Sequence, residues 1–300
     1  MIYCQKNSKG ADTVAVKERA PQTKKYLRLG ILAVTLGMIV LILLGRSFRK
    51  VPEVILETTE PTPAPDTQTE PRSSAISLPK RNPYGPTDFQ YDGAYLQCTA
   101  GESRLGIDVS EHQRQIDWQQ VASAGIEFAM IRVGYRGYGA EGALHLDEYA
   151  LTNLEEAEQA GLDTGVYFFS QATTASEALE EALLVLKFLD GRQLNYPVVY
   201  DWEYVSDEAR TADISSQTLM DCITTFCQTI RRAGYRPMVY FNQTLAATML
   251  DLTALEEYEL WLAMYSDRMT YPFRIDMWQY TCEGSVPGIE GSVDINLYLP

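Results

Sequence analysis

The sequence predicts an α/β fold: an irregular eight-stranded β/α barrel, similar to a TIM barrel, that begins close to residue 101. From Leu105 onward, short apolar runs alternate with amphipathic helical segments, which is typical of alternating strands and helices. Near the end of the chain, the connections between apolar runs are too short for full helices. A doubly wound open sheet needs helices between its strands, so this pattern favours an irregular barrel.

Eight segments have the apolar, β-branched or aromatic composition of buried strands. They are residues 105–109, 128–134, 164–170, 198–202, 237–241, 260–265, 275–279 and 293–297. Gly125, Gly161 and Gly234 each follow an alanine at the end of a helical stretch, where a left-handed helix C-cap requires glycine. A helix is predicted over residues 175–190, with Thr174 as its N-cap.

An apolar stretch lies well before the predicted barrel. Residues 29–45 contain no charge and lie between Arg28 and Arg46, a length close to the lower limit for a helix that crosses a bilayer. A cleaved signal peptide is the alternative, but its basic region would be unusually long and its cleavage site poor. The sequence therefore predicts one transmembrane helix that acts as a signal anchor. Because residues 1–28 are basic, we expect them on the cytoplasmic side, with the rest of the chain outside and the protein in the cell membrane.

Residues 46–100 are expected to form an extracytoplasmic linker rich in proline and threonine. Eight of the fourteen prolines fall between positions 52 and 86, in a stretch with few large apolar residues. The end of the linker is less sharply marked, because aromatic residues between positions 84 and 95 are available to pack on the following domain. We place the boundary at Gly101, so that residues 101–300 form the folded domain.

Charge and cysteine content exclude several classes of function. The net charge is −15, but residues 1–50 carry +8 and residues 51–300 carry −23. An acidic body repels polyanions, which argues against binding to nucleic acid. The five cysteines show no metal-ligand spacing and there are two histidines, so neither a metal site nor another cofactor is predicted.

One predicted strand, in the segment NYPVVYDWEY at 195–204, ends in two acids. Because side chains alternate along a strand, Asp201 and Glu203 share one face and Trp202 lies on the other. The Cα atoms of the two acids are expected about 6.6 Å apart, close enough for each carboxyl to change the protonation of the other. Such a pair suits acid and base catalysis on one scissile bond. The simpler interpretation is a strand that ends in solvated acids.

Further acids and aromatic residues gather at the expected strand ends. Asp108 ends the first strand and Asp294 lies in the last, so both are expected near Asp201 and Glu203, because function in a barrel collects at the carboxyl ends of its strands. Six aromatic residues lie near strand ends: Tyr135, Tyr167, Phe169, Tyr240, Tyr265 and Trp278. Their flat faces suit sugar rings as substrate, although each one alone would also fit in the core. The chain has no Gly-x-Ser-x-Gly motif and no phosphate-binding loop.

Together these motifs resemble the glycoside hydrolase family 25 lysozymes, which are N-acetylmuramidases acting on bacterial peptidoglycan. The resemblance covers about residues 104–299. Its motifs are GIDVSEHQ at 106–113, IDW at 116–118, AGIEFAMIRVGY at 124–135, AGLDTGVYFFS at 160–170, PVVYDWE at 197–203, MWQYT at 277–281 and VDIN at 293–296. The family fold is an irregular β/α barrel, in agreement with the strand count. One departure is Arg114, where relatives usually have glycine.

The resemblance implies roles for the four acids. Glu203 would be the general acid, Asp201 its partner carboxylate, and Asp108 and Asp294 further acids that shape the site. It also implies cleavage of the β-1,4 bond between N-acetylmuramic acid and N-acetylglucosamine in peptidoglycan glycan strands. Three routes stay open for Asp201: direct attack, activation of water, or support of an attacking acetamido group. A protein that binds wall glycan without cutting it is the alternative, and the intact acids argue against it.

Overall fold

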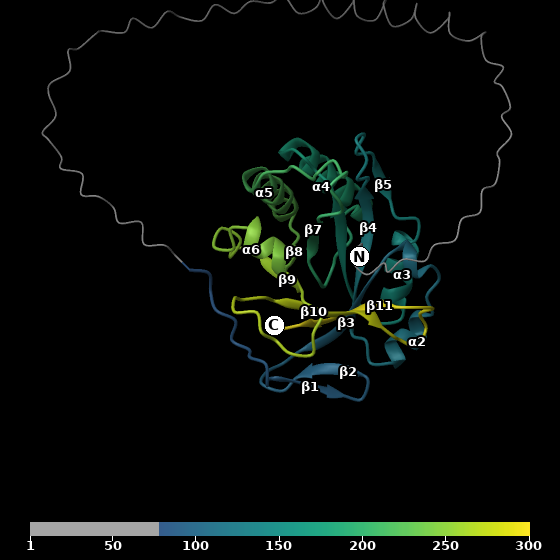
Figure 1. The fold of residues 1–300 in the computed structure, drawn as a ribbon. Coiled ribbons are helices and arrows are strands. Elements are labelled where there is room, and N and C mark those ends of the chain that lie inside the picture. The colour runs from purple at the N-terminus through teal and green to yellow at the C-terminus, as the bar shows by residue number, and fades with distance from the viewer. Residues whose placement is uncertain (1–77) are drawn as a thin grey trace, which may run out of the picture. The chain divides into compact units, whose positions relative to one another are not determined.

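The computed structural model describes residues 78–300, and within them nine strands form one sheet (Figure 1). Eight of these strands close into a barrel, and the ninth, β5 (Leu144–Leu146), pairs with the outer end of one of them. The barrel strands are β3 (Arg104–Val109), β4 (Phe128–Arg136), β6 (Asp163–Ser170), β7 (Val198–Trp202), β8 (Pro237–Asn242), β9 (Glu259–Ala263), β10 (Met277–Gly284) and β11 (Val293–Tyr298). The predicted eight-stranded barrel is confirmed.

The predictions for the N-terminal part of the chain have a different outcome. The basic segment 1–28, the transmembrane helix 29–45 and the linker residues 46–77 lie outside the described residues. Among residues 78–300, no helix combines the length and the apolar character that crossing a bilayer requires. The longest helix there, α5 (Ser216–Arg232), has 17 residues and ends in two arginines. The predicted localisation as a single-pass protein of the cell membrane is contradicted by this finding.

The barrel is irregular because its last strand is antiparallel to the strands on either side of it. The other seven barrel strands, β3, β4 and β6 to β10, run parallel to one another, and β3 pairs with β4 to close the sheet. β11 lies between β10 and β3 and is antiparallel to both. An antiparallel pair needs only a short connection, whereas a parallel pair needs a crossover, so the short segment after β10 fits this arrangement. The start of β11 therefore lies at the carboxyl edge of the other strands.

Helices follow most of the parallel strands. They are α2 (Trp118–Ser123), α3 (Ala150–Gln159), α4 (Ala175–Leu189), α5 and α6 (Gln243–Thr248), with the short 3-10 helix η2 (Glu111–Gln113) after β3. Gly125, Gly161 and Gly234 have φ values of 91°, 88° and 94°, so the predicted left-handed glycines are confirmed. The hydroxyl of Thr174 accepts a hydrogen bond from the backbone of Glu177 and caps α4, as predicted.

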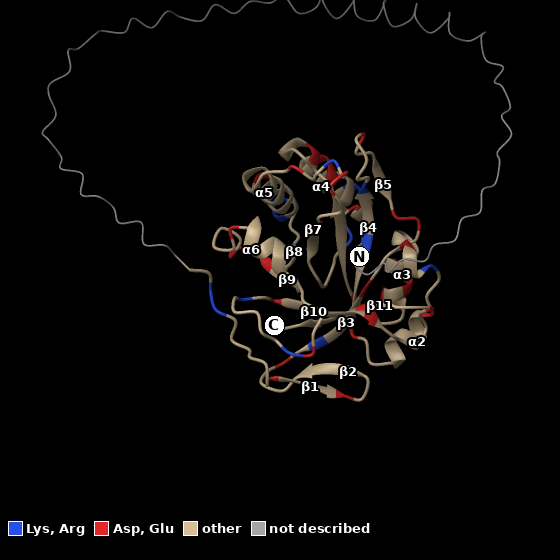
Figure 2. Ribbon diagram, in the orientation of Figure 1, with Lys and Arg blue, Asp and Glu red and all other residues tan. Residues whose placement is uncertain are grey.

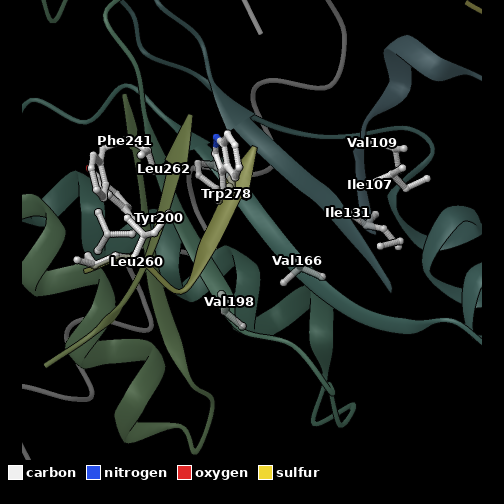
Figure 3. Close-up of a cluster of buried hydrophobic side chains, with 14 of the residues drawn as sticks. Ile107, Val109, Ile131, Val166, Val198, Tyr200, Phe241, Leu260, Leu262 and Trp278 are labelled. Carbon is white, nitrogen blue, oxygen red and sulfur yellow. The ribbon is translucent and has the colours of Figure 1, made fainter. Parts of the chain in front are cut away.

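Two groups of buried side chains fill the fold. The barrel interior holds Phe128, Trp261 and Met277 among others. The outer wall of the barrel carries a second group, including Tyr200 and Phe241 (Figure 3). Because side chains alternate along a strand, residues next to each other in sequence belong to different groups. This alternation decides which of the predicted residues reach the interior.

A two-stranded hairpin packs against the barrel from within the predicted linker. It consists of β1 (Phe89–Asp92) and β2 (Tyr95–Cys98). Phe89 is buried and contacts Trp278 edge to face, with ring centroids 5.0 Å apart. The Tyr280 hydroxyl accepts a hydrogen bond from the backbone of Leu96 at 3.3 Å. The aromatic residues noted before Gly101 thus contribute to the fold.

A buried arginine of β4 pairs with acidic residues of α4, and Figure 2 marks the basic and acidic residues of both elements. Arg136 is 4% exposed and donates from Nε to Oε1 of Glu181 at 2.7 Å, and Glu181 is fully buried. Arg136 also pairs with the exposed Glu180 at 3.1 Å. Burial raises the pKa of Glu181 to about 7, although hydrogen bonds from Ser170 and Arg136 act to lower it.

Arg136→Met is expected to lower the free energy of unfolding by about 3–5 kcal/mol, because it leaves Glu181 buried without its cation. Chemical denaturation measures the change. Glu180→Gln is the matched control: its side chain is 55% exposed, so its pair with Arg136 should contribute about 1 kcal/mol or less. An Arg136→Met protein as stable as wild type would show that the buried pair gives no net stabilisation.

Candidate active site

A small cavity opens at the carboxyl edge of the barrel strands. Its lining residues are Asp108, Arg132, Tyr167, Phe169, Asp201, Glu203, Tyr240, Trp261 and Gln279. Parallel strands bring their last inward-facing residues to the same edge, which is why residues so far apart in sequence meet there. Three of the four predicted catalytic acids and three of the six predicted aromatic residues line this cavity.

Asp108, at the end of β3, is held by two amide groups. Its Oδ2 accepts hydrogen bonds from Nε2 of Gln279 at 2.8 Å and from Nδ2 of Asn296 at 2.9 Å. Burial raises the pKa of Asp108 to about 6; the two hydrogen bonds oppose this rise and the charge of Glu203 adds to it. The carboxyl is therefore fixed in orientation and retains its proton to a higher pH than a free aspartate.

Asp201 and Glu203 are both buried, with 5% and 8% exposure, at the end of β7. Burial and the charge of Glu203 raise the pKa of Asp201 well above its ordinary value. Oδ1 of Asp201 is buried and, within the described part of the chain, has no hydrogen-bond partner; the same holds for the Tyr167 hydroxyl. Because buried polar atoms are rarely left unpaired, both atoms are available to a bound molecule.

Asp294 reaches this edge because β11 is antiparallel. It stands directly opposite Asp108 in the ladder between β11 and β3, and it is 4% exposed. Burial and the charge of Asp108 raise the pKa of Asp294 well above its ordinary value. Asp294 is a neighbour of the cavity rather than part of its lining. All four predicted acids thus lie together.

Asp294→Asn should leave the fold intact and lower kcat by about tenfold or more, because it replaces the buried carboxyl opposite Asp108 with an amide that cannot titrate. Circular dichroism tests whether the fold is intact, and a turnover assay measures the change in kcat. Asp276→Asn is a suitable control, since Asp276 precedes β10 at the amino edge and accepts a hydrogen bond from the backbone of Leu260 at 2.8 Å. Wild-type turnover in Asp294→Asn would remove this residue from the site.

Sequence reasoning missed Arg132, which faces the cavity from β4 and is 6% exposed. Its Nε donates to Oδ2 of Asp147 at 2.9 Å, and its guanidinium pairs with Glu111 at 3.1 Å. An arginine inside the apolar run AMIRVGY was the available signal, because a charged side chain in such a strand needs a buried partner. Trp261 and Gln279, also missed, line the cavity from β9 and β10.

The predicted aromatic residues divide between the site and other places. Tyr167, Phe169 and Tyr240 line the cavity. The hydroxyls of Tyr240 and Tyr265 both donate to Oε1 of Gln279, at 2.9 and 3.1 Å. Tyr265 is 48% exposed and lies at the rim.

Tyr135 and Trp278 do not line the cavity. Tyr135 is half-buried and stacks on His145, with ring centroids 4.9 Å apart. Trp278 is fully buried in the outer group, where its indole N–H donates to the carbonyl oxygen of Met264 at 2.8 Å. The reason is alternation: Gln279 faces inward, so its neighbour Trp278 faces outward.

A second cavity, of about 470 Å³, adjoins the first and shares Glu203 and Tyr240 with it. Its walls come from the loop after β7, from α6 and from the end of β9. The lining is mixed, with apolar side chains such as Ile214 and Met249 beside polar ones such as Asn242. Glu203 therefore lies between two spaces, each at the carboxyl edge of the barrel.

Comparison with known proteins identifies the family. Residues 107–289 match the model of the glycosyl hydrolases family 25. The chain belongs to this family. It is accordingly a glycoside hydrolase, a class of enzyme that usually works with a pair of carboxyl groups.

Relatives of this family 25 chain include proteins known by sequence and by structure. The uncharacterized protein YegX of Escherichia coli O6:H1 is 31% identical over 216 residues, covering 68% of this chain and 72% of YegX. Lysozyme M1 of Streptomyces globisporus is 27% identical over 206 residues, covering 64% of this chain and 67% of the lysozyme. The modular autolysin LytC of Streptococcus pneumoniae has a TM-score of 0.58 and 27% identity, covering 66% of this chain and 47% of LytC. The chain thus spans about half the length of that autolysin.

Proposed function

We propose that this protein is a muramidase that cleaves the β-1,4 bond between N-acetylmuramic acid and N-acetylglucosamine in peptidoglycan. The proposal is carried by the convergence of Asp108, Asp201 and Glu203, with Asp294 beside them, at one cavity. The lysozyme and autolysin relatives support it, and LytC has also been solved with a synthetic peptidoglycan ligand. We assign the activity to the barrel of residues 101–300 together with the hairpin packed on it.

Glu203 is the general acid in this proposal. It borders both cavities, so a glycan with one sugar in each would place the linking oxygen beside its carboxyl. Protonation of that oxygen makes the departing sugar a better leaving group. Glu203 directly follows the last residue of β7, and in this proposal it lies at the boundary between the two sugars.

Asp201 is the partner carboxyl. The two unpaired atoms near it, its own Oδ1 and the Tyr167 hydroxyl, suit the N–H and carbonyl groups of a 2-acetamido substituent. Of the three routes left open by the sequence, this arrangement favours attack by the acetamido oxygen with Asp201 holding its N–H. Asp108 and Asp294 set the charge around Asp201, and the faces of Phe169 and Tyr240 support the sugar rings.

The test is the chemistry of the new chain ends. Purified peptidoglycan is digested with the protein, the new reducing ends are reduced with borohydride, and the sugars are identified after acid hydrolysis. A muramidase leaves N-acetylmuramic acid at the new reducing ends, so the sugar that borohydride reduces is derived from N-acetylmuramic acid. Reduced N-acetylglucosamine would instead identify a glucosaminidase, and binding to the wall without new ends would identify a glycan-binding protein.

A further inference from the structure

The loop that follows β7 contributes lining residues to both cavities. Residues 203–215 connect β7 to α5, and the first of them is Glu203. Tyr204, Thr211 and Ile214, from the same loop, line the second cavity. The position of this loop therefore determines where Glu203 lies and also the shape of the second cavity.

Gln171, the residue directly after β6, connects the first residue of this loop to a residue farther along it. It is fully buried, and its Nε2 donates to the carbonyl oxygen of Glu203 at 2.8 Å. Its Oε1 accepts a hydrogen bond from the hydroxyl of Thr211, which is 1% exposed, at 2.7 Å. One side chain thus connects two loop residues that lie eight positions apart. Its Nε2 also donates to the carbonyl oxygen of Ser170 at 2.9 Å, which fixes the amide in this orientation.

Arg210, in the same loop, also holds Gln171 in place and connects it to α4. Its guanidinium donates to the carbonyl oxygen of Gln171 at 3.1 Å and to Oε1 of Glu177, in the first turn of α4, at 2.6 Å. Although burial alone would raise the pKa of Glu177, hydrogen bonds from Arg210 and Thr173 lower it to about 2. Glu177 is therefore charged at neutral pH and anchors Arg210. The backbone N–H of Arg210 also donates to the carbonyl oxygen of Tyr138 at 3.0 Å.

We infer that Gln171 is a positioning residue that fixes the backbone of Glu203, with Thr211 and Arg210 holding Gln171 in place. A hydrogen bond to the carbonyl of Glu203 limits rotation of the peptide that carries the acid, and displacement of a catalytic group by about 1 Å can lower the rate about 10²-fold. The inference rests on the proposed function, because it assigns the reason why Glu203 reaches the leaving oxygen. Gln171 itself does not line either cavity.

Gln171→Leu removes the donor and the acceptor while keeping a similar volume. Steady-state kinetics on soluble peptidoglycan fragments should show kcat lowered by about tenfold or more, with KM changed by less than about twofold. The split is expected because the acid moves relative to the bond, while most of the sugar-binding surface stays in place. A merely structural role would lower the folded fraction and leave the turnover of the folded enzyme unchanged.

Thr211 supplies a second test that alters less of the core. Thr211→Val removes the hydroxyl that holds Gln171, and kcat should fall by about threefold or more. Thr211→Ser keeps the hydroxyl, so it should lose clearly less of the wild-type kcat than Thr211→Val does. Because both substitutions act through the same contact, the double variant Gln171→Leu/Thr211→Val should be no slower than Gln171→Leu alone. If Gln171→Leu does not fold, the contrast between valine and serine at Thr211 decides the question.

Tyr280→Phe is the control, since it removes a buried hydrogen bond to the β1–β2 hairpin, away from both cavities. Its melting temperature should fall while kcat stays at the wild-type value. Wild-type kcat in Thr211→Val, or an equal loss in Thr211→Ser, would overturn the positioning role even if Glu203→Gln is inactive. Failure of the wild-type protein to produce new reducing ends would overturn the proposed function and this inference with it.

Discussion

Glu203→Gln is expected to lower kcat on unactivated wall glycan by about 10²- to 10⁴-fold, with glycan binding and melting temperature nearly unchanged. Glutamine keeps the shape of the side chain and a hydrogen-bond donor, but it cannot deliver a proton to the leaving oxygen. The largest loss should therefore appear on substrates whose leaving sugar needs that proton. Reducing-end assays give kcat, and co-sedimentation with insoluble wall gives binding.

Glu208→Gln is the matched control for this substitution. Glu208 lies on the same loop after β7, is exposed, and is not among the lining residues of either cavity. The control should therefore turn over at the wild-type rate. If Glu203→Gln digested peptidoglycan as fast as Glu208→Gln, Glu203 would not be the general acid.

Asp201→Asn is expected to lower kcat by about 10²-fold and, at pH 7, to raise Tm by about 2–4 °C or more. Activity falls because the neutral amide oxygen of asparagine accepts the acetamido N–H more weakly than a carboxylate does. Stability rises because burial and the charge of Glu203 make the carboxyl of Asp201 costly to ionise in the folded protein. A residue that destabilises the fold but supports the reaction is typical of active sites.

The rise in Tm of Asp201→Asn should depend on pH, in a direction that follows from the raised pKa of Asp201. A carboxyl whose pKa is raised on folding binds its proton more tightly in the folded state than in the unfolded state. The wild-type protein therefore loses stability as pH rises from about 3.9, the ordinary value for aspartate, through the raised value. Asparagine does not titrate, so the difference in Tm should vanish below about pH 4 and grow with pH.

Thermal melts of wild type and Asp201→Asn across this pH range measure the effect directly. Asp108 and Asp294, whose pKa values are also raised, are present in both proteins, so the difference reports Asp201 together with its interactions with them. Asp213→Asn, at an exposed position, should show no pH-dependent gain. A Tm difference that shrank as pH rose would mean that Asp201 is stabilised as a carboxylate, contrary to this account.

Much of the fold could be predicted because its signals are local. A run of apolar residues indicates a buried strand. All eight segments predicted in this way form barrel strands. The glycines at Gly125, Gly161 and Gly234 are required by backbone geometry within a few residues of each helix end. The pair Asp201 and Glu203 was also predictable, because alternation along one strand places them on one face.

The supporting residues of the site could not be predicted in the same way. Gln171 contacts Glu203 and Thr211, which are 32 and 40 residues further along the chain. Gln279 contacts Asp108 across 171 residues. No short segment contains both partners of these hydrogen bonds, so only the closed barrel shows that they meet.

The sequence by itself determined the strands, the glycine joints and the acids at the strand ends, because backbone sterics and side-chain alternation act over a few residues. The tertiary structure alone decided the direction of β11, which brings Asp294 opposite Asp108. It also decided that Arg132 faces the cavity and that Trp278 packs in the outer group. These outcomes depend on which strands become neighbours, and closure of the barrel sets that through contacts between residues far apart in the chain.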